Sequence, residues 1–176
     1  MPLDPELYFD LSMDEIREVA RFAVAPVEDA LALLDDAPDP RITAAFHAAR
    51  RFADGEPRSK LQRTTALDAH RAARDATDPV AQHIAAAAAD AAASAYLHPF
   101  AKGDQVAHIL RSTAHAALAT EATEPGADGV REVLDQAVRR ATPTLRNVLH
   151  RYPPFPHGRN RVTQVMCELD LALRQT

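Results

Sequence analysis

Apolar residues recur every three or four positions along most of the chain, and polar residues fill the positions between them. This period matches the roughly 3.6 residues per turn of an α-helix and places the apolar side chains on one helix face. The clearest such face consists of Ile42, Ala45, Phe46, Ala49 and Ala53. The two-residue alternation that is typical of a half-buried strand does not occur. The pattern therefore predicts an all-α protein.

Short polar side chains mark where several of the predicted helices begin. Ser12 stands three residues before Glu15, which is the spacing of a capping box. Asp-Pro pairs at 39–40 and 78–79 place a proline at a first helical position, whereas Pro26 lies inside an apolar run and predicts a kink or a break. Together these signals predict seven or eight helices, within residues 12–34, 39–55, 59–76, 78–95, 104–121, 130–141, 142–149 and 162–173.

The segments between the predicted helices are short and rich in proline and glycine. Residues 124–129 form one such segment, and residues 152–158, with three prolines, form another, so both are predicted to be loops. Short connections favour antiparallel packing of successive helices. We therefore expect a single all-helical domain over residues 1–176, either a multi-helix bundle or a short array of α-hairpins, with the first ten residues as an extended N-terminal arm.

Alanine is the most unusual feature of the composition. It fills 37 of the 176 positions, and nine of these lie among the eleven residues from Ala85 to Ala95. Alanine has the highest helix propensity, and its small side chain lets neighbouring backbones approach closely. We expect the helix that contains this run to be packed tightly against its neighbours.

Several classes of protein do not fit the sequence. No apolar run approaches the roughly 20 residues of a membrane-spanning helix, and the acidic N-terminus does not resemble a secretory signal. With Cys167 as its one cysteine the chain cannot form an internal disulfide, so a cytoplasmic protein is expected. Phosphate loops, GxGxxG turns, HExxH pairs and CxxC pairs do not occur in the sequence. We therefore expect no cofactor.

The net charge of −5 conceals a strong segregation of charge along the chain. Residues 1–40 hold eleven acidic residues against two arginines, whereas residues 136–167 hold six arginines and no acidic residue. Guanidinium groups are permanent cations whose planar donors suit carboxylates and phosphates. We predict a binding site for a protein partner or an anionic ligand, made of Arg146, Arg151, Tyr152, His157, Arg159 and Arg161.

The same arginines admit a second interpretation, in which they pair with the acidic residues 1–40 and close the bundle. Because helical surfaces are charged in most proteins, this interpretation needs no ligand. A duplex nucleic acid is a poor partner for a chain that is acidic as a whole, and no feature of the sequence indicates membrane contact. The oligomeric state is not predicted.

The eight histidines are the other candidates for chemistry. His108 and His115 are seven residues apart and therefore share a helix face. No glutamate precedes a histidine by three residues, so the di-iron motif of helical bundles is missing, and Cys167 lies in mid-helix like a plain buried thiol. We predict neither catalytic residues nor metal ligands. The alternative is a small enzyme or metalloprotein whose site inside the bundle uses His47, His70, His108 or His115.

Between residues 39 and 120 the chain resembles a known family. The motifs that carry the resemblance are Asp39-Pro40-Arg41, Ala-Ala-Arg-Arg at 48–51, Asp54-Gly55-Glu56, Ala-His-Arg-Ala-Ala-Arg-Asp at 69–75, the alanine-rich helix, His98 and Ala114-His115-Ala116. In these the chain is similar to an actinobacterial family of small all-α proteins that are classified as putative immunity proteins. The family carries a histidine-rich turn after the alanine helix, of which His98 is present here while Tyr96 occupies another place.

The resemblance implies a non-enzymatic protein that binds and neutralises a partner toxin. Similar short chains sometimes carry the label of an SbcC-type exonuclease, which would imply an accessory role in DNA repair. That ATPase requires a phosphate loop and long coiled coils, and the sequence contains neither. Protein binding is therefore the function that we expect, with the small enzyme or metalloprotein and the exonuclease-associated protein as alternatives.

Overall fold

The computed structural model describes residues 7–123 and 127–175, which are helical apart from turns, loops and one isolated bridge between Tyr8 and Phe100. The prediction of an all-α fold is confirmed. The α-helices are α1 (Met13–Leu31), α2 (Pro40–Ala53), α3 (Lys60–Asp75), α4 (Pro79–Ala93), α5 (Ala107–Thr123), α6 (Ala127–Arg140), α7 (Pro143–His150) and α8 (Arg161–Gln175), with short 3-10 helices at Ser94–Tyr96 and Gly103–Val106.

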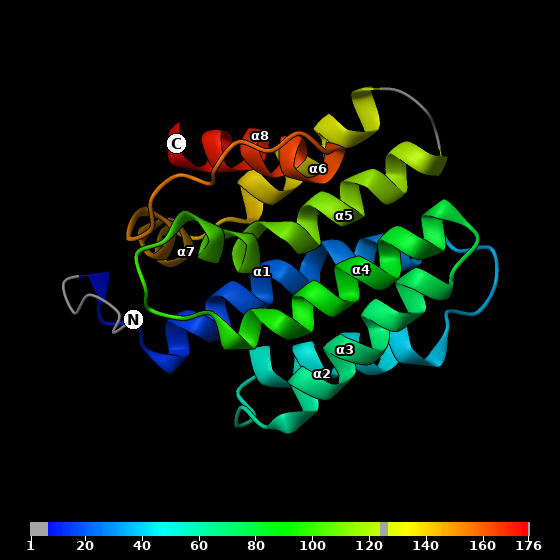
Figure 1. Cartoon of the computed structure of the whole chain (residues 1–176), viewed down its shortest axis with the longest axis horizontal. Coiled ribbons are helices and arrows are strands. Elements are labelled where there is room, and N and C mark those ends of the chain that lie inside the picture. The colour runs from blue at the N-terminus through cyan, green and yellow to red at the C-terminus, as the bar shows by residue number, and fades with distance from the viewer. Residues whose placement is uncertain (1–6, 124–126, 176) are drawn as a thin grey trace.

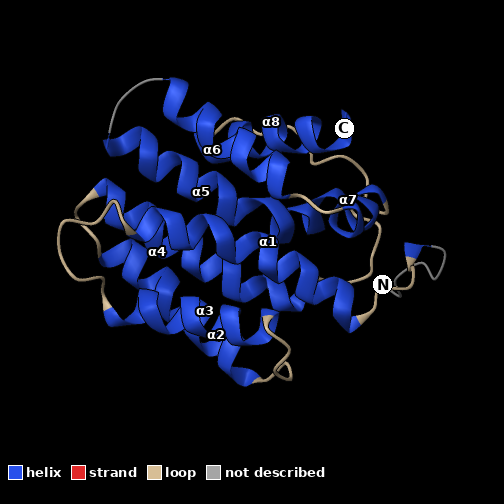
Figure 2. Ribbon diagram, turned by 180° about the vertical axis from the view of Figure 1, so that it is seen from behind, coloured by secondary structure: helices blue, strands red, loops and turns tan. Residues whose placement is uncertain are grey.

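The helices are arranged in three layers (Figure 1). The middle layer contains α1, α4 and α5, while α2 and α3 cover one side and α6 and α8 cover the other. The view from behind shows the same order, with α7 at one end of the molecule (Figure 2). Because α4 packs against α1, α2, α3 and α5, it lies at the centre of the first half of the fold.

The two halves of the interior are built from side chains of different size. Around α4 the core consists mostly of alanines, joined by a few larger residues such as Ile42 and Phe46. Between α5, α6, α7 and α8 the core contains leucine, valine and methionine, with Leu149 and Leu169 fully buried. Small side chains therefore bring the helices around α4 close together, as the composition predicts.

The helix starts are those that the capping signals predict. Ser12 and Glu15 form a complete capping box at α1, and Asp39 and Asp78 cap α2 and α4 with a proline at the next position. Of the kink or break predicted at Pro26, the break is wrong, because α1 continues through this residue to Leu31. A proline removes one backbone hydrogen bond, and the buried face on both sides of Pro26 keeps the helix in one piece.

Two other predictions concern the ends of segments. The loop predicted at 124–129 is too long, because α6 already begins at Ala127, and residues 124–126 lie outside the described part. The predicted N-terminal arm covers the first ten residues, of which residues 1–6 also lie outside the described part of the chain. Within its described part, the backbone N–H of Phe9 donates a hydrogen bond to the carbonyl of Pro99. Among the helices of the described ranges, none combines the length and apolarity that crossing a membrane requires.

Candidate functional site

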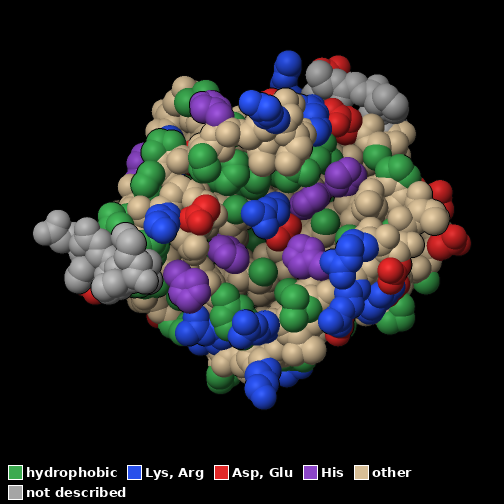
Figure 3. Space-filling model, in the orientation of Figure 1, with side chains coloured by type: hydrophobic (Ala, Val, Ile, Leu, Met, Phe, Trp, Pro, Cys, Tyr) green, Lys and Arg blue, Asp and Glu red, His purple; other side chains and the backbone are tan. Residues whose placement is uncertain are grey.

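Five of the eight histidines lie near one another on a single face of the molecule, above α4 and between α3 and α5. The space-filling view shows histidine side chains around a hollow in the surface, with basic side chains beside them (Figure 3). The hollow includes a cavity of about 390 Å³ that is lined by Arg63, Ala66, Leu67, His70, Ala93, Tyr96, His98 and His108. We use the name histidine groove for this cavity together with the adjoining side chains of His83, Asp90, Arg111 and His115.

The alanine-rich sequence of α4 explains why a groove forms here. From Ala85 to Ala92 every residue except Asp90 is an alanine, and each of these eight residues is buried. Since α4 presents methyl groups, it supplies a low floor over which the longer side chains of α3 and α5 can meet. Asp90 is the one polar group in that floor.

Asp90 is surrounded by nitrogen atoms that lie slightly too far away for hydrogen bonds. Its Oδ1 is 3.6 Å from Nη1 of Arg111 and 3.8 Å from Nε2 of His70, and its Oδ2 is 3.8 Å from Nε2 of His115. Direct hydrogen bonds between such groups span about 2.7–3.2 Å. Oδ2 is fully buried and has no hydrogen-bond partner. Because burial disfavours its charged form, the pKa of Asp90 rises to about 7, although Arg111 acts in the opposite direction.

His83 and His115 form a pair beside this carboxyl group. Their Nδ1 atoms are 3.0 Å apart, so one ring donates a hydrogen bond to the other. When Asp90 is charged, it favours a hydrogen on the facing Nε2 of His115, which makes His83 the donor of the pair. Burial lowers the pKa of His115 to about 3, and the neighbouring His83 and Arg111 add to the effect. The pair is therefore uncharged at neutral pH.

His70 and His108 are held in the neutral form as well. Burial lowers the pKa of His108 to about 4 and also lowers that of His70. The positive charge of the groove therefore comes from arginine, above all from Arg63 and Arg111, which both reach the surface. Leu67 and Tyr96 add apolar surface to the cavity. The volume of about 390 Å³ lies at the lower end of the range of ligand pockets.

The structure brings together three of the four histidines that the sequence suggests for an enzyme or metalloprotein. His70, His108 and His115 belong to the groove, whereas His47 is an exposed residue of α2. Within residues 7–123 and 127–175, no three side chains among His, Cys, Asp and Glu are placed to hold a metal ion. Cys167 is half-buried on α8, with its thiol 3.9 Å from the carbonyl of Pro156.

Most of the C-terminal residues predicted as a binding site contact the chain itself. Arg146 donates hydrogen bonds to the carbonyls of Val138 and Leu173, and Tyr152 is buried with its hydroxyl donating to the carbonyl of His98. Arg151 pairs with Glu15, and Arg161 pairs with Glu121.

The other two predicted residues, His157 and Arg159, are exposed in the segment before α8. The pairing of Arg151 with Glu15 agrees with the alternative interpretation, in which acids of residues 1–40 bind these arginines. We use the name C-terminal surface for the six residues of this predicted site, from Arg146 to Arg161. Contact between this surface and a partner stays a prediction.

The Glu15–Arg151 pair makes a prediction about acid stability. Glu15 also accepts a hydrogen bond from the backbone of Ser12, and the bond from Arg151 together with this cap lowers its pKa to about 2. A lowered pKa in the folded state stabilises the protein above the ordinary pKa of 4.5, and this contribution is lost as the pH falls towards 2. We expect Glu15→Gln to cost about 1 kcal/mol at pH 7. In urea unfolding, the difference in free energy of unfolding between Glu15→Gln and wild type should disappear near pH 2. A difference that stays constant with pH would contradict this role of the Glu15–Arg151 pair.

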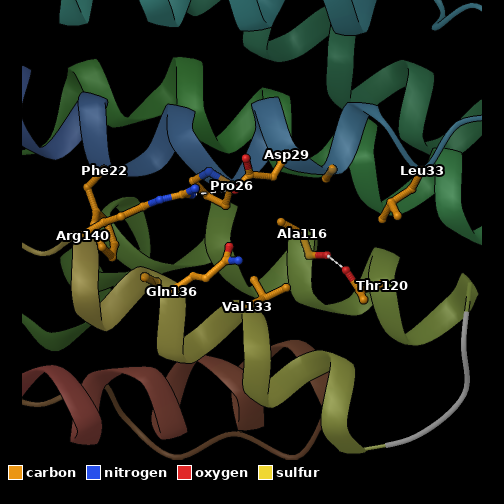
Figure 4. Close-up of a pocket in the computed structure, with 11 residues that line it drawn as sticks. Phe22, Pro26, Asp29, Leu33, Ala116, Thr120, Val133, Gln136 and Arg140 are labelled. Carbon is orange, nitrogen blue, oxygen red and sulfur yellow. Dashed lines mark hydrogen bonds and ion pairs between the residues drawn. The ribbon is translucent and has the colours of Figure 1, made fainter.

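Two other cavities are weaker candidates. One of about 70 Å³ lies between α1, α5 and α6, beside Pro26 and the ion pair of Asp29 with Arg140 (Figure 4). It is too small for a ligand larger than a few water molecules. The other, of about 690 Å³, is an open depression at the loops before α2 and α4, where Arg41 already pairs with Asp39 and Asp75.

A comparison with known protein families finds one family to which the chain is similar. A family model described as Imm-5 like putative immunity protein matches residues 10–143, about three quarters of the chain. The chain belongs to the Imm-5 like putative immunity protein family. Among curated proteins and among solved structures, none matches it.

The part that matches the Imm-5 like family contains one of the two candidate surfaces. Every residue of the histidine groove, from Arg63 to His115, lies inside the matched residues 10–143. All six C-terminal residues, from Arg146 to Arg161, lie outside them. The groove therefore lies in the part of the chain that the family model matches.

Sequence reasoning missed Asp90, Arg111 and Arg63 as members of the site. Asp90 carries a signal in retrospect, because a single carboxyl group in a run of alanines must be buried if the helix is central. Arg111 lies between His108 and His115 on α5, one helical turn from each. The sequence could place His108, Arg111 and His115 on one helix face. It could not show that this face lies opposite Asp90.

Proposed function

We propose that this Imm-5 like protein is an immunity protein that binds and neutralises a partner toxin, with the histidine groove as the contact surface. Membership of the family supports the general function. The observation that carries the choice of surface is the buried Asp90, whose Oδ2 has no partner, beneath groups that reach the solvent. A buried unsatisfied carboxyl group costs free energy, so its presence calls for a role beyond packing. The protein would act in the cytoplasm, where its free thiol is stable.

The residues around Asp90 have the chemistry of a protein contact. Arginine and tyrosine are enriched among the residues that dominate binding energy, and the groove contains Arg63, Arg111 and Tyr96 with the exposed Leu67 beside them. Arg58 lies over the ring of Tyr96, with the guanidinium carbon 5.5 Å from the ring centre. Such a mixture of cations and apolar surface fits a partner segment that carries acidic groups.

The general function is tested by neutralisation in living cells. The protein is co-expressed in a bacterial host with a candidate toxin chosen from the genes that neighbour its own. We expect growth to be restored, because an immunity protein blocks its toxin by direct binding. Continued growth arrest with a folded, expressed protein would overturn the proposed function.

Removing the charge of Arg111 tests the proposed surface. Arg111→Gln deprives Asp90 of its counter-ion, so the double variant Arg111→Gln/Asp90→Asn is made as well to keep the interior neutral. Loss of a central arginine costs about 2 kcal/mol of binding, so we expect both variants to bind the toxin about 30-fold more weakly by calorimetry.

The matched control is Arg159→Glu, an exposed change on the predicted C-terminal surface. It should bind the toxin like wild type if the groove is the contact surface. A double variant that binds normally, combined with a loss of binding in Arg159→Glu, would assign the contact to the C-terminal surface instead.

A further inference from the structure

The contact between Asp90 and Arg111 is loose and lies at the edge of the solvent. The carboxyl group is buried, with 6% of its side chain exposed, whereas 43% of the Arg111 side chain is exposed. The shortest distance between the two groups is 3.6 Å, which is too long for the charge-assisted hydrogen bond that such a pair usually makes. Arg111 can therefore turn towards an outside anion without breaking a close contact.

The groups that face Asp90 from the helices around it carry positive charge or none. Arg111 and His115 face it from α5, His70 faces it from α3, and His83 stands behind His115. Arg74, an exposed residue of α3, acts on His70. α1 and α2 pack against α4 through alanine, valine, isoleucine and phenylalanine side chains. Two other carboxylates act on the groove from outside this cluster, Asp104 on His108 and Glu121 on His83. An incoming anion close to Asp90 itself would thus meet Arg111 and neutral histidine rings.

We propose that the groove captures a carboxylate side chain from an acidic segment of the partner protein, and that Arg111 exchanges Asp90 for this carboxylate while Asp90 takes up a proton. The inference rests on the proposed function, because the partner is the toxin. Asp90 is then a positioning residue that holds Arg111 in the free protein. The ligand itself contacts Arg111, Arg63 and the ring nitrogens of His70.

The exchange is balanced in charge and in protons. In the free protein, Arg111 carries the one guanidinium group that pairs with Asp90 among the residues that the structure describes. When a ligand carboxylate attracts that guanidinium group, Asp90 would be left as a buried charge, which is unfavourable. A proton from solvent removes the charge, and the pKa of about 7 makes this easy near neutral pH. Binding therefore takes up a proton in those molecules in which Asp90 is ionised, about half of them at pH 7, and becomes weaker as the pH rises.

The test measures the affinity for a hexaglutamate peptide by calorimetry at pH 6 and pH 8. A pKa of about 7 leaves roughly nine tenths of Asp90 protonated at pH 6 and roughly one tenth at pH 8. Wild type should therefore bind the peptide about tenfold more tightly at pH 6. Asp90→Asn imitates the protonated state, so it should bind at pH 8 as tightly as wild type does at pH 6, with most of the pH dependence gone.

The matched control is Asp29→Asn, which removes the acid of another Asp–Arg pair, that of Asp29 with Arg140 on α1 and α6. This variant should keep the tenfold ratio. Equal affinity of wild type at both pH values, weaker binding by Asp90→Asn, or no binding of hexaglutamate would each overturn the inference. Inorganic phosphate that binds as tightly as the peptide would overturn it too, in favour of a small-anion site. Neutralisation of the toxin by wild type would still support the proposed function in each of these cases.

Discussion

Asp90→Asn should stabilise the protein at pH 8 and destabilise it near pH 4. Burial raises the pKa of Asp90 from 3.8 to about 7, so between these pH values the folded state holds a proton that the unfolded chain releases. Stability is therefore lost as the pH rises from about 4 to about 7. A shift of this size corresponds to at most about 4 kcal/mol. A buried amide also needs hydrogen bonds, and this costs about 2 kcal/mol at every pH. We therefore expect a net gain of about 2 kcal/mol at pH 8 and a net loss of about 2 kcal/mol near pH 4.

The gain is measured by urea unfolding of both proteins at pH 4, 6 and 8. Asp29→Asn again serves as the control, because its exposed carboxyl group should give no gain at any of these pH values. A loss of stability in Asp90→Asn at pH 8 would contradict the account. It would mean that attraction to Arg111 outweighs the burial of the carboxyl group, and that the free protein has no reason to release this pair.

Ala88→Leu should lower the free energy of unfolding by about 3 kcal/mol. Ala88 is completely buried in α4, and four other helices, α1, α2, α3 and α5, pack against that helix. A leucine adds three carbon atoms, which the alanine core can accept only by moving a neighbouring helix. Overpacking of this kind costs about 1–3 kcal/mol, and the closely packed backbones around α4 place this change at the upper end.

The control for this substitution is Ala44→Leu, at an exposed position of α2. Both residues have high helix propensity, so we expect the control to change stability by less than about 0.5 kcal/mol. Equal midpoints of urea unfolding for Ala88→Leu and wild type would contradict the account. They would show that the floor of the histidine groove has room to spare.

The fold class and most helix ends could be predicted from the sequence because their causes are local. Ser12, Asp39 and Asp78 cap helices through their own side chains, and the apolar faces repeat within each helix. The break allowed at Pro26 does not occur, because the packing that keeps α1 continuous comes from other helices. The start of α6 at Ala127 was missed because Gly129 next to Asp128 resembles a turn.

The candidate site could be predicted only in fragments. The seven-residue spacing of His108 and His115 places both on one face of α5, and both do belong to the groove. The partner of His115, however, is Asp90 on another helix, and spacing says nothing about which helices become neighbours. The C-terminal arginines show the same limit, since Arg151 meets Glu15 across 136 positions of sequence.

The central claim is that the histidine groove, rather than the C-terminal surface, contacts the partner. The most direct measurement records the NMR resonances of the eight histidine rings while a candidate toxin, chosen from the genes that neighbour this one, is added. We predict that the resonances of His70, His98 and His108 shift on binding, while that of His157 stays in place. A shift of His157 with no change at the three groove histidines would contradict the account.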